Sequence, residues 1–240
     1  MTTTSVTRQT TDSSSALHYY VVYDAAGVPE GLLAEEFLLA ADYSSVGLVS
    51  VGWSRADGRW YEASATSRRL RVDAVLRKRV TLVGRSAAAA LYRDLCGADL
   101  PDEDALRARF GASPAQPPSP LRLSDSEPRP GFRETRVYRI LFANELSPGS
   151  LAALSEAWQM PITGDIADPE VRVLGAQRRQ VSGDAFRWEL RRVAAGAACG
   201  LDVTCDLLGE RDEAVGVLLR GLTTQMRQQG MLPVTVDRFR

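Results

Sequence analysis

The chain has 240 residues, with 29 basic against 30 acidic side chains, 45% apolar residues and a single histidine. This length and composition suit a globular protein with a sizeable core. The net charge of −1 excludes a global field that would steer the chain toward nucleic acid or an anionic membrane. One histidine, His18, excludes a His-rich metal site, and any serine or cysteine nucleophile with a histidine base would have to use it.

The N-terminal residues 1–16 contain ten Ser or Thr and lack the apolar run of a signal peptide, which predicts a disordered tail. No stretch reaches the roughly 18–20 apolar residues of a membrane span, so we expect a cytoplasmic protein without a membrane partner. Lys78 is the only lysine, and this preference for arginine is typical of a GC-rich bacterial genome. The three cysteines lie in apolar runs without zinc or redox spacing, which predicts buried free thiols: Cys96, Cys199 and Cys205.

Proline density predicts one boundary in the chain. Six of the 12 prolines fall within Gly111–Gly131, where they favour an extended, semi-rigid spacer. We therefore expect a linker at 111–131 between an N-terminal domain (17–110) and a C-terminal domain (132–240). A single domain with a long excursion is the alternative, and an Arg-Trp pair in each half leaves internal duplication open.

The N-terminal half reads as a mixture of strands and helices. Its β-branched and aromatic runs predict strands, an Asp-Gly turn signal predicts a hairpin, and alanine-rich or acidic starts predict helices. In chain order these are a strand at Leu17–Tyr23, a helix within Leu32–Ala41, a hairpin of Val46–Trp53 and Arg59–Ala65, a strand at Val80–Val83, and helices at Ser86–Leu95 and Asp102–Phe110.

The C-terminal half has sharper local signals. Ser147 followed by Pro148 predicts a helix start, Ser182-Gly183-Asp184 a hairpin turn, and Gly230 a helix stop. The expected elements are a strand at Arg136–Ala143, a helix after Ser147, a hairpin of Val171–Val181 and Phe186–Val193, a strand or strand continuation at Leu201–Leu208, a helix at Glu210–Gln229 and a strand at Met231–Phe239.

The order of these elements predicts the fold class. The C-terminal half follows a β-α-β-β-α-β pattern, which is the ferredoxin-like arrangement. We expect an α+β protein with antiparallel sheets and helices packed on one face of each sheet.

Catalytic signatures are missing from the sequence. It contains no nucleophile elbow, P-loop, dinucleotide-binding or EF-hand spacing. Acidic pairs stand at helix starts, where they complement the helix dipole. The sequence therefore names no catalytic residue, metal or cofactor and favours a non-catalytic role, with an enzyme built on arginine and carboxylate chemistry as an alternative.

One segment is strongly basic and predicts a nucleic-acid surface as an alternative function. Its arginines and lysine could contact phosphates, and the neighbouring Trp60 could stack on a base. The basic residues are Arg68, Arg69, Arg71, Arg77, Lys78, Arg79 and Arg85, and the hairpin arginines Arg178, Arg179, Arg187, Arg191 and Arg192 could extend the surface.

A second segment, Leu146–Leu154, contains Ser147, Pro148, Gly149 and Ser150 directly after the first strand of the C-terminal half. It is similar to the strand-to-helix turn of ACT-type regulatory domains. The resemblance implies a loop at these four residues that binds a small effector such as an amino acid, and pairing of two such domains side by side.

From these observations we expect a non-catalytic adaptor, regulatory or assembly protein that acts through protein–protein contacts. Half-covered sheets leave faces or edges free for a partner, and tethered domains suit multivalent contacts. The expected partners are other proteins, with a second copy of the chain among the candidates. Nucleic-acid binding, small-ligand sensing and catalysis without histidine or metal are the alternatives.

Overall fold

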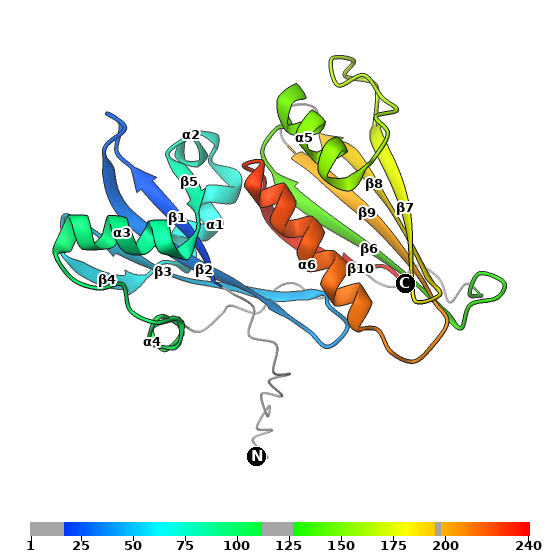
Figure 1. The fold of residues 1–240 in the computed structure, drawn as a ribbon. Coiled ribbons are helices and arrows are strands. Elements are labelled where there is room, and N and C mark those ends of the chain that lie inside the picture. Colours follow the sequence, from blue (N-terminus) through cyan, green and yellow to red (C-terminus); the bar gives the residue numbers. More distant parts are fainter. Residues whose placement is uncertain (1–16, 112–126, 195–197) are drawn as a thin grey trace, which may run out of the picture.

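The structure is a computed structural model that describes residues 17–111, 127–194 and 198–240. These residues form two antiparallel five-stranded sheets and six helices, which confirms the α+β class (Figure 1). Each sheet belongs to one half of the chain. The expected tail at 1–16 and residues 112–126 of the expected linker lie outside the described residues. No described helix is long and apolar enough to span a membrane.

The N-terminal sheet has the strand order β4-β3-β2-β1-β5. Alternate side chains of β1 point to opposite faces: Tyr19 packs in a core with α3 and α4, whereas Tyr20 packs with α1. Helices therefore cover both faces of this sheet, not one as expected. The elements are β1 (His18–Tyr23), β2 (Pro29–Leu39), β3 (Ser45–Ser54), β4 (Arg59–Glu62), α1 (Ser64–Val72), α2 (Ala74–Arg77), β5 (Val80–Val83), α3 (Arg85–Cys96) and α4 (Glu103–Arg107).

The helix predicted within Leu32–Ala41 is wrong, because residues 32–39 belong to strand β2 and residues 40 and 41 begin the turn after it. Strand β2 pairs with β1 on one side and β3 on the other. Both of its faces are buried, with Leu32 and Leu33 in different cores. A strand buried on both faces loses the alternation of apolar and polar residues, so its short apolar run resembles a helix.

The C-terminal sheet has the strand order β10-β6-β9-β8-β7, and α5 and α6 cover one of its faces. The local signals predicted its helix boundaries well: Ser147 caps α5 by accepting the backbone N–H of Ser150, and Gly230 after α6 has φ +78°. The elements are β6 (Glu134–Ala143), α5 (Pro148–Trp158), β7 (Val173–Val181), β8 (Asp184–Ala194), β9 (Ala198–Leu207), α6 (Glu213–Gln228) and β10 (Leu232–Arg238).

The structure does not confirm the ferredoxin-like arrangement expected for this half, because the half has one strand more than that pattern. Strand β9 is an independent strand that pairs with β6 on one side and β8 on the other, so the half contains five strands in β-α-β-β-β-α-β order. The sequence could not separate β9 from β8, because apolar alternation continues through both. The two sheets also differ in strand order, which does not support duplication of one half.

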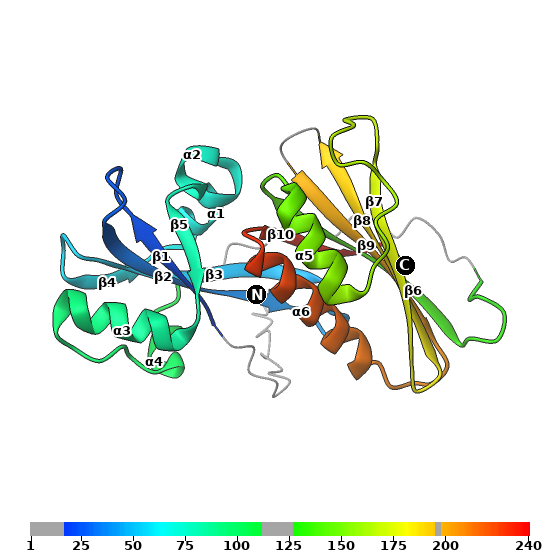
Figure 2. The same ribbon diagram turned by 45° about the horizontal axis from the view of Figure 1, so that its top comes forward.

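The β2–β3 hairpin joins the two halves by reaching under α6 and β10 (Figures 1 and 2). Ser45 Oγ accepts the backbone N–H of Val236 at 2.9 Å, and the Tyr138 hydroxyl donates to the carbonyl of Asp42 at 2.9 Å. The Tyr43 ring packs on Gly216 of α6, and its hydroxyl donates to Asp212 at 3.1 Å. The described halves therefore contact each other through a packed interface.

Two glycines of α6 provide a matched test of this contact. A Cβ added at Gly216 would lie 2.5 Å from Cε1 of Tyr43, whereas one at Gly221 would meet no atom within 4 Å. Gly221→Ala should raise the free energy of unfolding by up to about 1 kcal/mol through helix propensity. Gly216→Ala should lower it by about 1–3 kcal/mol through overpacking, as measured by urea denaturation.

The penalty of Gly216→Ala should disappear when Tyr43 is already replaced by Ala, because the ring that the new Cβ meets is then absent. Equal changes in stability for Gly216→Ala and Gly221→Ala would contradict the packed contact.

Candidate functional site

A buried charge cluster lies where the two halves meet. The Glu35 carboxylate on β2 is fully buried between Arg71 of α1, whose Nη2 lies 2.9 Å from Oε1, and Arg227 of α6, whose Nη2 lies 3.6 Å from Oε1. The hydroxyls of Ser67 and Tyr20 donate to the same carboxylate at 3.1 and 3.2 Å. We call these residues, together with His18, the Glu35 cluster.

His18 stands opposite Glu35 on the neighbouring strand, and its Nε2 lies 2.7 Å from Nη1 of Arg227. Burial and the charge of Arg227 lower the pKa of His18 to about 3, so the ring is neutral and accepts a hydrogen bond from Arg227. Burial alone would raise the pKa of Glu35, but the charges of Arg71 and Arg227 outweigh it and hold that pKa at about 2. At neutral pH the cluster holds one carboxylate between two guanidinium groups, and it joins the two halves in the interior.

The structure does not gather the residues of the predicted nucleic-acid surface into one free surface. Arg71 belongs to the Glu35 cluster. Trp60 packs on Tyr92 with ring centroids 5.6 Å apart and donates its Nε1–H to the Tyr92 hydroxyl. Four of the other residues have partners within the chain. Arg69 pairs with Asp73, Arg79 pairs with Glu30, Arg77 donates to the carbonyls of Leu70 and Arg71, and Arg85 donates to the Tyr19 hydroxyl and the Pro101 carbonyl. Arg68 and Lys78 are exposed.

The predicted small-ligand loop lies at the exposed start of α5. Ser147 Oγ accepts the Ser150 N–H at 3.0 Å and lies 2.9 Å from Ser150 Oγ. Pro148 and Gly149 form the first helical turn and are exposed. These contacts are those of an ordinary helix N-cap.

The cysteines are free thiols, as expected, but only two of them are buried. Burial raises the pKa of Cys199 and of Cys205 to about 12, which makes both thiols poor nucleophiles at neutral pH. The expectation of burial is wrong for Cys96, which lies exposed in the last turn of α3. An apolar run in a helix does not indicate which of its residues are exposed to solvent.

The second face of the C-terminal sheet carries polar side chains and is not covered by any of the described helices (Figures 1 and 2). Along β8, Phe186 and Trp188 are buried against α5 and α6, whereas Arg187 is exposed on the opposite side. We call this second face the open face. Its side chains include Arg178, Arg187, Glu189, Asp202, Thr204 and Asp206.

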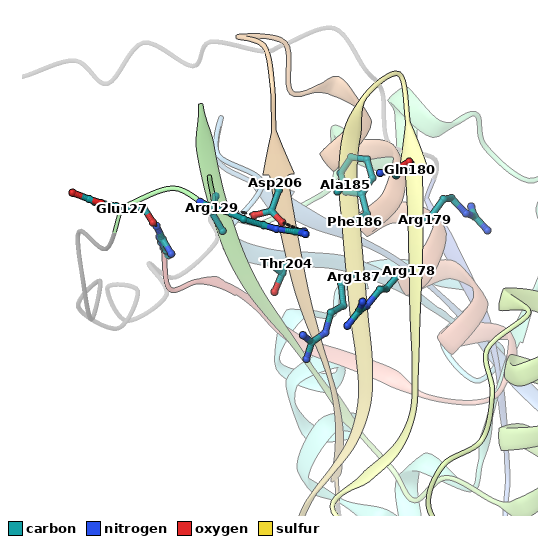
Figure 3. A pocket seen from close by; sticks show the side chains of 12 residues that line it. Glu127, Arg129, Arg178, Arg179, Gln180, Ala185, Phe186, Arg187, Thr204 and Asp206 are labelled. Atoms are coloured by element: carbon teal, nitrogen blue, oxygen red, sulfur yellow. Dashed lines mark hydrogen bonds and ion pairs between the residues drawn. The ribbon is translucent and has the colours of Figure 1, made fainter. Parts of the chain in front are cut away.

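A groove of about 680 Å³ lies on the open face (Figure 3). At one end Asp206 is already engaged, since Arg129 lies 3.4 Å from its carboxylate and the Thr135 hydroxyl donates to it at 2.6 Å. At the other end the side chains of Arg178 and Arg187 lie side by side. The charged side chains that line the groove are Arg129, Arg178, Arg187 and Arg240 against Glu127 and Asp206, since that of Arg179 points away and stacks on Trp188 (Figure 3).

Hairpin geometry places Arg178 directly opposite Arg187. The connecting turn has two residues with positive φ, Ser182 and Gly183, so the pair that closes it is hydrogen-bonded. Hydrogen-bonded and non-hydrogen-bonded pairs alternate along a hairpin. Arg178 and Arg187 are three pairs beyond the closing pair and therefore form a non-hydrogen-bonded pair, in which the Cα atoms are about 4.5 Å apart. The Arg178 N–H accordingly donates to the Gln177 side chain at 2.8 Å, away from β8.

The two arginines are unequally neutralised. Arg187 forms an ion pair with Glu189, whereas the Arg178 guanidinium forms none within the described part of the chain. Like charges directly opposite each other destabilise a sheet. The sequence alone indicates both residues only as an extension of the basic segment, although the two-residue turn and the strand alternation contain the signal that they face each other.

The lone histidine makes the Glu35 cluster testable by pH. Unfolded His18 binds a proton near pH 6.5 and the folded ring only near pH 3, so acidification through this window favours unfolding, by at most about 1.4 kcal/mol per pH unit. Glu35 adds to this loss below about pH 4.5, as pH falls toward its folded pKa of about 2. Urea denaturation at pH 7, 6 and 5 should show a falling free energy of unfolding for the wild type and a flatter profile for His18→Gln. Parallel profiles would contradict this account.

No protein-family model, curated protein or solved structure matches this chain. Its function has to be argued from the geometry of the open face and the Glu35 cluster.

Proposed function

We propose that this chain is a non-catalytic adaptor or assembly protein that binds a partner protein through the open face of its C-terminal sheet. One observation carries the proposal. Helices α1–α4 cover both faces of the N-terminal sheet and α5 and α6 cover one face of the C-terminal sheet, while the open face has no such layer among the described residues and contains the groove.

The size of the open face suits a protein partner. Five strands about 4.8 Å apart and about ten residues long span roughly 24 by 33 Å. That area is on the order of the 800 Å² that a standard interface buries on each partner. The face also combines polar side chains with a central groove, as interfaces between separately folded proteins do.

A catalytic role has less support. Arginine remains protonated and is a poor general acid or base, and the Asp206 carboxylate in the groove is held by Arg129 and Thr135. Glu35, the most strongly perturbed carboxylate among the described residues, is fully buried and paired. These groups suit recognition better than proton transfer.

Nucleic-acid binding is the second candidate, and the excess of arginine in the groove favours it. Two features of the groove weigh against it. Glu127 and Asp206 are interleaved with the arginines and would repel a phosphate backbone. Phe186, the one aromatic residue that lines the groove, is 3% exposed and cannot stack on a base.

Affinity capture with matched variants tests the partner surface. Arg178→Gln/Arg187→Gln removes two positive charges from the open face, and Arg68→Gln/Lys78→Gln removes two exposed positive charges from the N-terminal half. We expect quantitative mass spectrometry to find the same partner on the wild type and the control variant, and its loss from the open-face variant.

Retention of every wild-type partner by Arg178→Gln/Arg187→Gln would contradict the proposal, as would equal loss from both variants. For the second candidate, a gel-shift titration at low salt is decisive. No complex with single- or double-stranded probes excludes nucleic acid, and a complex lost only in the open-face variant supports it over a protein partner.

A further inference from the structure

We infer that the partner segment seated in the groove is acidic and that one of its carboxylates bridges Arg178 and Arg187. This inference rests on the proposed function and names the chemistry of the partner. It follows from two groups of charged side chains on the open face, one in which a carboxylate pairs with both arginines and one in which it does not.

The complete arrangement centres on Asp202 of β9. Its carboxylate accepts hydrogen bonds from Arg139 of β6 at 2.6 Å and from Arg191 of β8 at 2.9 Å. One carboxylate thus satisfies two arginines from the strands on either side. Although burial raises the pKa of Asp202, the hydrogen bonds from Arg139 and Arg191 outweigh it and lower that pKa.

The incomplete arrangement centres on Arg178 and Arg187, which lie directly opposite each other on β7 and β8. Arg187 forms an ion pair with Glu189 of its own strand, and Thr204, the residue of β9 opposite Arg187, carries a hydroxyl. The side chains of Arg178 and Arg187 lie side by side, and Arg178 has no carboxylate partner among the described residues (Figure 3). A carboxylate from outside the chain would supply the missing charge and accept hydrogen bonds from both guanidinium groups.

Charge also selects among the occupants of the groove. A second copy of the chain, packed face to face about a two-fold axis, would bring arginines against arginines near the centre of the contact. A nucleic-acid backbone would meet the carboxylates of Glu127, Glu189 and Asp206. In an acidic peptide segment, individual carboxylates contact the arginines of the groove, while neutral residues of the peptide lie beside Glu127, Glu189 and Asp206.

Peptide binding to the full-length chain tests this chemistry. The probe is a fluorescein-labelled ten-residue peptide of alternating Glu and Ser, compared with its Gln-Ser counterpart by fluorescence anisotropy at low salt. We expect only the Glu peptide to bind, with weaker binding as salt is added. Arg178→Gln/Arg187→Gln should weaken binding at least tenfold, and Arg68→Gln/Lys78→Gln should change it less than twofold.

Thr204 provides the sharper variant. Thr204→Asp places a carboxylate directly opposite Arg187, where it competes with the peptide for that guanidinium group. It should weaken binding of the Glu peptide at least tenfold, while the neutral Thr204→Asn of similar size changes it less than twofold. A thermal melt of each variant shows whether a loss of peptide binding comes from unfolding. If the double variant unfolds, the single Arg178→Gln variant is used in its place.

Several results would overturn the inference. These are absence of Glu-peptide binding, equal binding of the Gln peptide, equal effects of Thr204→Asp and Thr204→Asn, or tighter binding of a ten-nucleotide thymidine DNA strand that the same substitutions abolish. A dimer on size-exclusion chromatography that Thr204→Asp dissociates would identify a second copy as the occupant instead.

The peptide-binding experiment and the affinity capture test different statements, so one can give a negative result without the other. If affinity capture loses a partner with Arg178→Gln/Arg187→Gln but the Glu peptide does not bind, the open face is a docking surface and the acidic chemistry is wrong. If the peptide binds as expected but capture is unchanged, the proposed function is wrong.

Discussion

The ion pairs of Glu35 with Arg71 and Arg227 hold together elements that are distant in the sequence. Placing an ionised carboxylate in the interior is unfavourable by several kcal/mol unless it is paired, and removal of one partner of such a pair typically costs about 3–5 kcal/mol. Arg71 comes from α1 and Arg227 from α6, so the two halves of the chain must be in contact for Glu35 to keep both partners. Folding of each half is therefore coupled to the position of the other.

This coupling determines which surface a partner can reach. Helix α6 supplies Arg227 to the Glu35 cluster and packs against Tyr43, so the helix-covered side of the C-terminal sheet is turned toward the N-terminal half (Figures 1 and 2). The open face is consequently turned away from that half. A rigid interface on one side of the sheet thus leaves its other side in a defined orientation for recognition.

Local chemistry could be predicted from the sequence, and long-range pairing could not. Ser147, Pro148 and Gly230 act through neighbouring backbone atoms, so their roles as helix boundaries follow from the residues themselves. Strand β2 was predicted as a helix because burial of both its faces depends on partners elsewhere in the chain. Arg71 was interpreted as a phosphate contact for the same reason, since its carboxylate partner, Glu35, is 36 residues away.

The candidate site also combines a local feature that the sequence predicts with long-range pairings that it does not. The turn at Ser182 and Gly183 was predictable, but the contacts of Asp202 with Arg139 and Arg191 require the pairing of β9 with both neighbouring strands.

The cross-strand pair of Arg178 and Arg187 also has a consequence for the unbound protein. Natural sequences mostly avoid local conflicts, and those that persist concentrate at functional positions. The β7–β8 hairpin contains such a contact at its solvent face, where Glu189 offsets the charge of Arg187 but no described carboxylate offsets that of Arg178. The hairpin is thus less stable empty than occupied, so a bound anion contributes to the order of the edge of the sheet as well as to the affinity of the complex.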